Sequence, residues 1–205
     1  MMKIKSAEFE VSAPDIRASP KWALPEFAFI GRSNVGKSSL INLLTERRDL
    51  AKVSDTPGKT KLINFFVING AWSLVDLPGY GYAQVGHQRR LEFNEAVAGF
   101  LSGRRNLRCV FVLIDSRLPP QPIDLEFLRW LSDCTVSFAL VFTKTDKQSA
   151  SQSQANIELF KNAFRESGAP LPDILVSSAK TRAGRNDILN HIANTLAKHN
   201  RSTGA

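Results

Sequence analysis

One stretch of this chain constrains its fold more than any other, because a glycine-rich turn separates an apolar run from a helix-like run. The apolar run covers residues 27–30, and the helix-like run covers residues 40–44. Strand, turn and helix in this order have the spacing of a phosphate-binding loop, whose backbone N–H groups and helix start surround phosphate oxygens. The residues of the predicted loop and helix start are Gly31, Arg32, Ser33, Asn34, Val35, Gly36, Lys37, Ser38 and Ser39.

Two side chains of this loop have distinct expected roles. Lys37 would reach the outer phosphates, and the Ser38 hydroxyl would be a ligand of Mg²⁺. The simpler alternative is a glycine-containing turn between a strand and a helix, with a lysine that faces solvent.

The composition is that of a globular chain with a surplus of positive charge. Of the 205 residues, 43% are hydrophobic, which is enough for one domain with a substantial core. The 27 Lys and Arg outnumber the 19 Asp and Glu and give a formal charge of +8, which favours an acidic partner such as nucleic acid. The alternative is ordinary solubilising surface charge.

Neither the apolar runs nor the cysteines point to a membrane or a metal site. The longest apolar run, at 110–114, is too short to cross a bilayer, and residues 1–10 do not resemble a secretory signal. We therefore expect a cytoplasmic protein without a membrane partner. Cys109 and Cys134 lie in apolar surroundings, which predicts buried thiols.

Strand-like and helix-like segments alternate along the chain, which predicts an α/β fold. We expect a mostly parallel six-stranded sheet with one antiparallel strand and helices on both faces. Asn69-Gly70 between two apolar runs predicts a hairpin. Residues 1–22 show weak periodicity and are expected to be an extension across the domain. The domain itself would cover residues 23–199, and residues 200–205 would be a short flexible tail.

Three further motifs follow predicted strands, at the edge where open α/β sheets bind ligands. Asp76-Leu77-Pro78-Gly79 supplies a carboxylate for a Mg²⁺-bound water and a glycine N–H for a terminal phosphate. In Thr143-Lys144-Thr145-Asp146, the carboxylate of Asp146 offers two acceptors that match the N1–H and N2–H donors of guanine. Ser177-Ser178-Ala179 would place the backbone N–H of its last residue near the guanine O6.

Together these motifs resemble those of the EngB family of bacterial P-loop GTPases. The resemblance rests on the runs at 31–42, 56–60, 76–83 and 143–146, and it covers the chain from about residue 23 to the last helix. It implies a Ras-like, GTPase-type domain that binds GTP and GDP and hydrolyses GTP as a molecular switch. It also implies that the partner is the large ribosomal subunit or its precursor, including rRNA, and that the protein acts as a monomer in ribosome assembly, normal cell division and septation.

The resemblance extends the site to a switch segment. Thr60 would ligate Mg²⁺ with its hydroxyl and the terminal phosphate with its backbone N–H, and Thr56 is the rival for this role. The groups that act on the reacting phosphate would be Lys37, Thr60 and Gly79. The Mg²⁺ ligands would be Ser38, Thr60 and Asp76. The switch residues expected at the nucleotide are Gly58, Lys59, Thr60, Lys61 and Leu62.

Two positions depart from the better-known small GTPases. Tyr80 stands where many of them have a water-positioning glutamine, so we expect slow intrinsic hydrolysis. Catalysis would then be completed by the partner particle or by K⁺ held with help from Asn34. Thr143 replaces an asparagine and has fewer hydrogen-bonding groups, which predicts moderate nucleotide affinity.

Two other classes of protein stay open. The chain could be an RNA- or ribosome-docking module that nucleotide only stabilises, with incidental turnover. It could also be a P-loop kinase or ATPase, which Asp146 disfavours. His87, His191 and His199 share no motif with a nucleophile, and the three tryptophans are expected to pack in the core rather than stack on bases.

Overall fold

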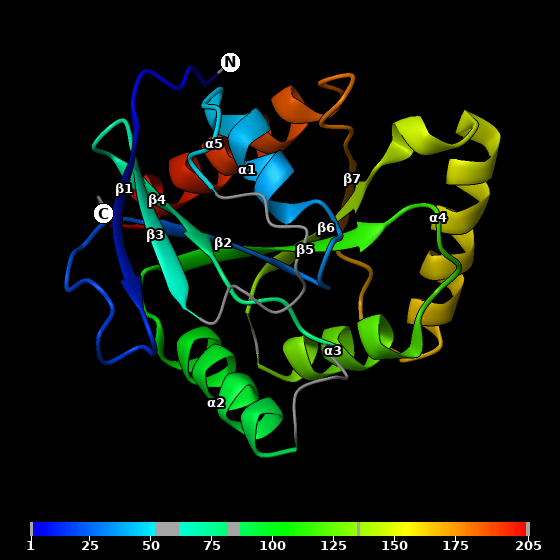
Figure 1. Ribbon diagram of the computed structural model, residues 1–205, viewed down its shortest axis with the longest axis horizontal. Coiled ribbons are helices and arrows are strands. Elements are labelled where there is room, and N and C mark those ends of the chain that lie inside the picture. Colours follow the sequence, from blue (N-terminus) through cyan, green and yellow to red (C-terminus); the bar gives the residue numbers. More distant parts are fainter. Residues whose placement is uncertain (1, 52–61, 82–86, 135, 204–205) are drawn as a thin grey trace.

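A mixed sheet runs through the middle of the molecule, with helices on both of its faces (Figure 1). The computed structural model describes residues 2–51, 62–81, 87–134 and 136–203. Within these residues the sheet has seven strands in the order β1-β3-β4-β2-β5-β6-β7. The strands are β1 (Ala7–Ala13), β2 (Glu26–Gly31), β3 (Ile63–Ile68), β4 (Trp72–Asp76), β5 (Leu107–Asp115), β6 (Phe138–Thr143) and β7 (Asp173–Val176).

The predicted α/β class and the predicted single antiparallel strand are confirmed. Among the described strands, β3 alone runs antiparallel to its two neighbours, β1 and β4. All other neighbouring strands are parallel. The Asn69-Gly70 hairpin is also confirmed, because both residues have positive φ angles, 52° and 62°, and Ala71 N–H donates to the Ile68 carbonyl at 2.9 Å.

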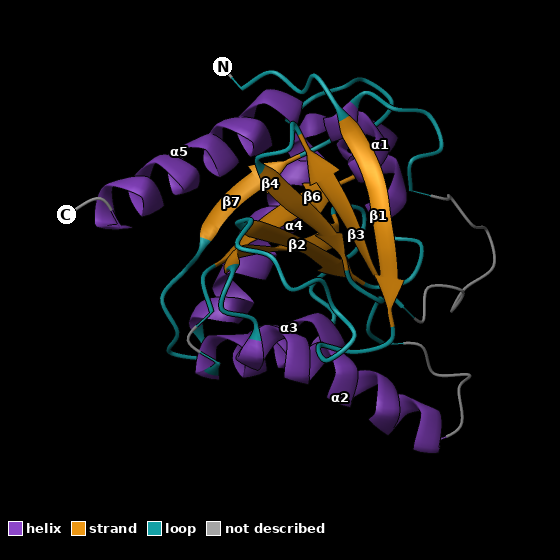
Figure 2. Ribbon diagram, turned by 90° about the vertical axis from the view of Figure 1, so that its left-hand side faces the viewer, coloured by secondary structure: helices purple, strands orange, loops and turns teal. Residues whose placement is uncertain are grey.

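The predicted number of six strands is corrected to seven, because residues 7–13 form β1 at the edge of the sheet. Figure 2 shows β1 alongside β3, and their register runs from Ala7 opposite Ile68 to Ala13 opposite Ile63. Most side chains of β1 are exposed or half-buried, so the apolar alternation that identifies a strand in sequence is missing. The strand exists because β3 would otherwise leave a row of unpaired backbone N–H and C=O groups.

The helices divide between the two faces of the sheet. Their bounds are α1 (Lys37–Thr45), α2 (His87–Gly103), α3 (Pro122–Asp133), α4 (Ala150–Arg165) and α5 (Arg185–Thr203). Helices α1 and α5 pack in one apolar cluster, and α2, α3 and α4 pack in another. Along β2, Phe27 and Phe29 enter the first cluster while Ala28 and Ile30 enter the second, so this central strand is buried on both faces. None of the described helices is both long and apolar enough to span a membrane.

Candidate nucleotide-binding site

The loops that follow four parallel strands meet at one edge of the sheet, and together they carry the predicted site residues. Residues 32–36 follow β2, 77–79 follow β4, 144–146 follow β6 and 177–179 follow β7. Because these strands are parallel, their carboxyl ends lie at the same edge. The structure therefore brings together motifs that lie more than 140 residues apart in sequence.

The phosphate loop has the backbone conformation that its glycines were expected to allow. Gly36, directly before α1, has a φ of 103°, which is strained for any residue with a side chain. Gly31 leaves no room for a Cβ, which would lie 2.8 Å from the Leu113 carbonyl oxygen. Leu40 N–H donates to the Gly36 carbonyl at 2.9 Å, so the helix begins directly after the loop and its first N–H groups point toward it.

Lys37 and Asp76 contact each other across the phosphate loop. Their ion pair is almost closed to solvent, because the side chains are 10% and 5% exposed. The second Asp76 oxygen accepts from Asn64 Nδ2 at 3.5 Å. The described residues hold no group of three or more His, Cys, Asp or Glu side chains that could bind a metal ion. The carboxylate of Asp76 and the hydroxyl of Ser38 are oxygen donors that suit Mg²⁺, which takes its remaining ligands from phosphate and water.

One of the two carboxylate oxygens of Asp146 accepts a hydrogen bond, and the other does not. Its Oδ1 accepts a hydrogen bond from Ser178 Oγ at 2.6 Å, and this bond is the main cause that lowers the pKa of Asp146. Its Oδ2 is shielded from solvent and has no hydrogen-bond partner among the described residues. Lys147 Nζ lies 3.9 Å from this oxygen, which is beyond hydrogen-bond distance. A shielded acceptor without a hydrogen-bond donor costs free energy, so the geometry fits a ligand that brings N–H donors, as guanine does.

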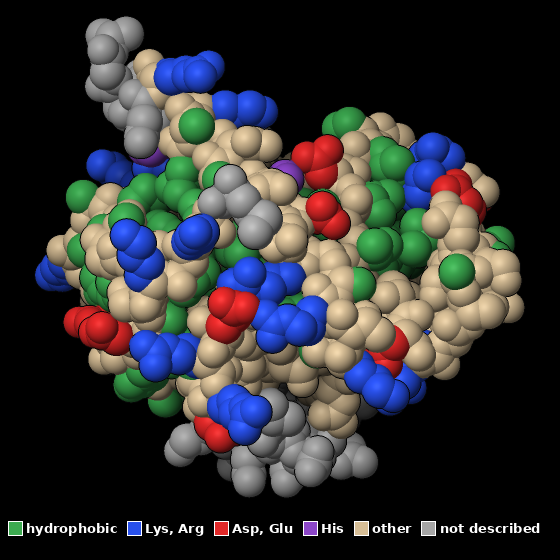
Figure 3. Space-filling view, turned by 90° about the horizontal axis from the view of Figure 1, so that it is seen from above, with side chains coloured by type: hydrophobic (Ala, Val, Ile, Leu, Met, Phe, Trp, Pro, Cys, Tyr) green, Lys and Arg blue, Asp and Glu red, His purple; other side chains and the backbone are tan. Residues whose placement is uncertain are grey.

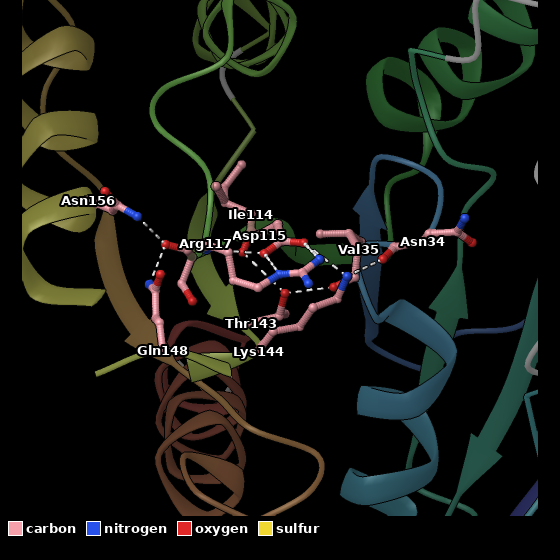
Figure 4. Close-up of polar contacts among 10 residues, drawn as sticks. Asn34, Val35, Ile114, Asp115, Arg117, Thr143, Lys144, Gln148 and Asn156 are labelled. Atoms are coloured by element: carbon pink, nitrogen blue, oxygen red, sulfur yellow. Dashed lines mark hydrogen bonds and ion pairs between the residues drawn. The ribbon is translucent and has the colours of Figure 1, made fainter. Parts of the chain in front are cut away.

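Thr143 contacts the backbone of the phosphate loop through its hydroxyl (Figure 4). Its buried hydroxyl lies 2.6 Å from the Val35 carbonyl oxygen and 3.2 Å from that of Ile114, and it donates to them. The side chain is thus engaged with the protein backbone, and its effect on a nucleotide would be transmitted through the loop. We predicted Thr143 as a nucleotide contact, and the structure adds this bracing role.

Lys144 ties the same loop to the end of β5. Its Nζ donates to the Asn34 carbonyl at 2.5 Å and to Asp115 Oδ2 at 2.9 Å (Figure 4). Arg117 also binds Asp115, through Nε at 2.9 Å and Nη2 at 2.8 Å. Burial acts to raise the pKa of Asp115, but the hydrogen bonds from Arg117 and Lys144 outweigh it and lower the pKa to about 2.

Asp115 and Arg117 were missed in the sequence analysis. The available signal was the position of Asp115 at the carboxyl end of a buried strand, the same placement that identified Asp76. Thr145 contacts the loop after β7, because its N–H lies 3.4 Å from the Ser177 carbonyl.

The loop after β7 is held in shape by a close backbone approach. Ser177 N–H donates to the Phe142 carbonyl at 2.7 Å, and Ser178 N–H donates to that of Ala183 at 3.2 Å. Gly184 closes the loop with a φ of 75°, and a Cβ there would lie 1.7 Å from the Val176 carbonyl oxygen. Ala179 follows Ser178, whose hydroxyl donates to Asp146.

The remaining residues that were predicted at the nucleotide lie in several parts of the chain. Gly58, Lys59, Thr60 and Lys61, together with the rival Thr56, lie outside the described residues. Leu62 is 41% exposed. Leu77 packs in the core, and its N–H donates to the Phe29 carbonyl at 3.0 Å. Ser33 and Ser39 are half-buried in the loop and the first turn of α1, and Pro78 precedes Gly79 at the end of β4.

His191, Cys109 and Asp173 are arranged in a row without forming a nucleophilic site. His191 Nε2 lies 3.8 Å from Cys109 Sγ, and His191 Nδ1 lies 3.5 Å from Asp173 Oδ2. Burial raises the pKa of Cys109 to about 12, so the reactive thiolate does not form at neutral pH. The expected burial of Cys109 is confirmed, whereas Cys134 is only half-buried.

A phosphate loop at the start of α1, an aspartate at the end of β4 and the Asp146 carboxylate after β6 are arranged as in P-loop GTPases, and this chain is one of them. Over residues 26–144 it matches the family model described as 50S ribosome-binding GTPase. It belongs to the EngB family of GTP-binding proteins.

Curated relatives cover nearly the whole chain. The chain is 51% identical over 191 residues to a probable GTP-binding protein EngB from Christiangramia forsetii, covering 93% of this chain and 96% of the relative. It is 48% identical to the protein of the same description from Bacteroides fragilis, covering 93% and 95%.

Solved structures share the fold. The crystal structure of a probable GTP-binding protein engB has a TM-score of 0.69 at 22% identity, covering 84% of this chain and 99% of that one. Aquifex aeolicus Era bound to GDP and AlF4⁻ has a TM-score of 0.65 at 21% identity, covering 84% and 56%.

Proposed function

We propose that this GTPase is a molecular switch in assembly of the large ribosomal subunit and acts as a cytoplasmic monomer. The description of the matching family, 50S ribosome-binding GTPase, supports a ribosomal partner. The observation that carries the proposal in this chain is a basic surface, described below, at the sheet edge opposite the nucleotide site. A role in cell division and septation would follow from ribosome supply.

The nucleotide half of the switch uses the residues at the carboxyl edge. GTP would bind with its base at Asp146 and its phosphates at Lys37, with Mg²⁺ held by Ser38, Asp76 and Thr60. Thr60 and the Gly79 N–H would contact the terminal phosphate. Loss of that phosphate would release Thr60 and change the surface offered to the partner.

The basic surface consists of Arg105, Arg108, Lys198 and Arg201. It forms where the start of β5 meets the end of α5, and Arg108 Nη2 lies 2.9 Å from His199 Nε2. The sequence has no acidic residue between Glu95 and Asp115 and none after Asp187. Figure 3 shows Lys and Arg side chains on the projecting end of α5.

This charge suits a phosphate backbone more than a folded protein surface of mixed charge. Arg105, Lys198 and Arg201 are exposed and can each approach a phosphate. RNA contacts at the basic surface would leave the opposite sheet edge open to nucleotide.

The test is binding to purified large subunits and their precursors at several salt concentrations. Changing Arg105, Lys198 and Arg201 together to Ala is expected to weaken binding and to lower the salt slope by about two to three. The matched control removes three positive charges from α3 and α4, at Arg129, Lys161 and Arg165. GDP affinity should stay the same in both proteins. Equal weakening by the two sets of changes would reject the basic surface as the docking site.

A docking module with incidental turnover is the second candidate, and the position of Tyr80 favours it. The Tyr80 hydroxyl donates to Asp124 on α3 at 2.9 Å, so it is already engaged within the protein and does not orient an attacking water as a glutamine would. We propose two sources of stimulation, the ribosomal particle and K⁺ near the exposed Asn34. GTP turnover equal in KCl and NaCl, and unchanged by large-subunit precursors, would favour the docking module over the switch.

A further inference from the structure

Gly79, Tyr80 and Gly81, which follow β4, lie between the phosphate loop and α3. A Cβ on Gly79 would lie 2.6 Å from the Gly31 carbonyl oxygen, so only glycine fits against the loop there. A Cβ on Gly81 would lie 2.8 Å from Ile123 Cδ1, on α3. Tyr80, between them, pairs with Arg32 of the phosphate loop as an isolated parallel bridge.

Asp124 joins the two sides of this arrangement. One oxygen, Oδ1, accepts from the Tyr80 hydroxyl at 2.9 Å and from Arg32 Nε at 3.1 Å. The Asp124 side chain is only 1% exposed. The Tyr80 ring stacks on Phe127, one turn further along α3, with centroids 4.3 Å apart and planes 17° apart.

The protonation states favour these contacts. Burial raises the pKa of Tyr80 well above its ordinary value, so the hydroxyl keeps its proton and donates a hydrogen bond to Asp124. Burial also raises the pKa of Asp124 above its ordinary value, and the Arg32 charge and the hydrogen bond from Tyr80 offset only part of this rise. A buried carboxylate that loses either donor would keep an uncompensated charge, so the three side chains are expected to act as a unit.

We propose that Asp124 is a positioning residue for GTP hydrolysis, which holds residues 79–81 against the phosphate loop through Arg32 and Tyr80. The proposal rests on the role proposed above for the Gly79 N–H at the terminal phosphate. Because the Tyr80 hydroxyl is already engaged with Asp124, this segment contributes to catalysis through its backbone. A donor held in place before the reaction needs no reorganisation during it, and small displacements of such a donor slow the chemical step.

The test compares single-turnover GTP hydrolysis with GDP affinity, in purified protein without ribosomes. Tyr80→Phe keeps the ring stacked on Phe127 and removes the hydroxyl. Asp124→Asn removes the charge that holds Arg32. For each variant we expect a rate constant about tenfold lower at saturating GTP, with GDP affinity within about twofold of the original. The double variant should be no slower than the slower single variant, because both changes break the same unit.

Glu126→Gln, at an exposed position on the same helix, is the control and should leave both quantities unchanged. If Asp124→Asn does not fold, Tyr80→Phe alone decides the outcome, since it preserves the packing. Rates within twofold of the original in folded variants would overturn the proposal. A rate that falls only in step with GDP affinity would also overturn it, by showing a merely structural role. Since ribosomes are absent from the assay, these outcomes are independent of the assembly function.

Discussion

The hydroxyl of Thr143 donates to the Val35 carbonyl at 2.6 Å, so the strand that leads to the proposed base-binding residue Asp146 directly contacts the phosphate loop. Thr143 stands 108 residues after Val35 in the chain. This contact links the base and phosphate halves of the proposed site, so a change at Thr143 should affect binding of the whole nucleotide.

Replacing Thr143 by Val should therefore weaken GDP and GTP binding by about five- to tenfold, the equivalent of one lost hydrogen bond of about 1 kcal/mol. Thr143→Ser keeps the hydroxyl and is the control. Thr143→Asn, with a second donor, should bind more tightly than the original. Calorimetry with both nucleotides measures each affinity, and an Asn variant no tighter than the original would contradict the expected moderate affinity.

Asp146→Asn should exchange guanine for xanthine as the preferred base. The carboxylate accepts from two N–H donors, whereas the amide also donates and so matches the carbonyl that xanthine has in place of the guanine amino group. GDP should lose at least about a hundredfold in affinity while xanthosine diphosphate gains. Asp133→Asn, at an exposed site on α3, should change neither. Full discrimination for guanine in the Asp146→Asn protein would show that the base lies elsewhere.

Asp115 should make the stability of the fold depend on pH in the acid range. Its pKa is lowered in the folded state, so its contribution is present above the ordinary value of 3.8 and is lost as the pH falls through about 2. At pH 7, Asp115→Asn should lower the free energy of unfolding by about 1 to 2 kcal/mol, reduced from the full shift by solvent screening.

The measurement is urea unfolding of both proteins between pH 7 and pH 2. The difference in unfolding free energy should be constant near neutral pH and should shrink toward pH 2. A constant difference over the whole range would mean that Arg117 and Lys144 do not stabilise the ionised carboxylate.

Gly184→Ala should destabilise the protein by about 3 kcal/mol, because it combines a positive φ with a severe clash at the Val176 carbonyl. Gly168 offers a matched control. Its φ of 78° is nearly the same as the 75° of Gly184, but a Cβ there meets nothing within 4 Å among the described atoms. Gly168→Ala should cost only about 1 kcal/mol. Thermal unfolding of the two variants separates the conformational cost from the steric one, and equal costs would contradict the clash.

The sequence alone determined the features that local chemistry controls. The phosphate loop was predictable because Gly31, Gly36 and Lys37 follow a buried strand and precede a helix, and the hairpin because Asn69-Gly70 tolerates positive φ. The burial of the central strands followed from their continuous apolar runs.

Only the tertiary structure decided which distant groups meet. Strand β1 exists through pairing with β3, since its own side chains are mostly exposed. Asp124 reaches Arg32 across 92 residues, and Lys144 reaches Asn34 across 110. A sequence motif predicts the backbone conformation of its own residues. The edge of a strand or a buried carboxylate instead takes whichever partner the completed fold places beside it.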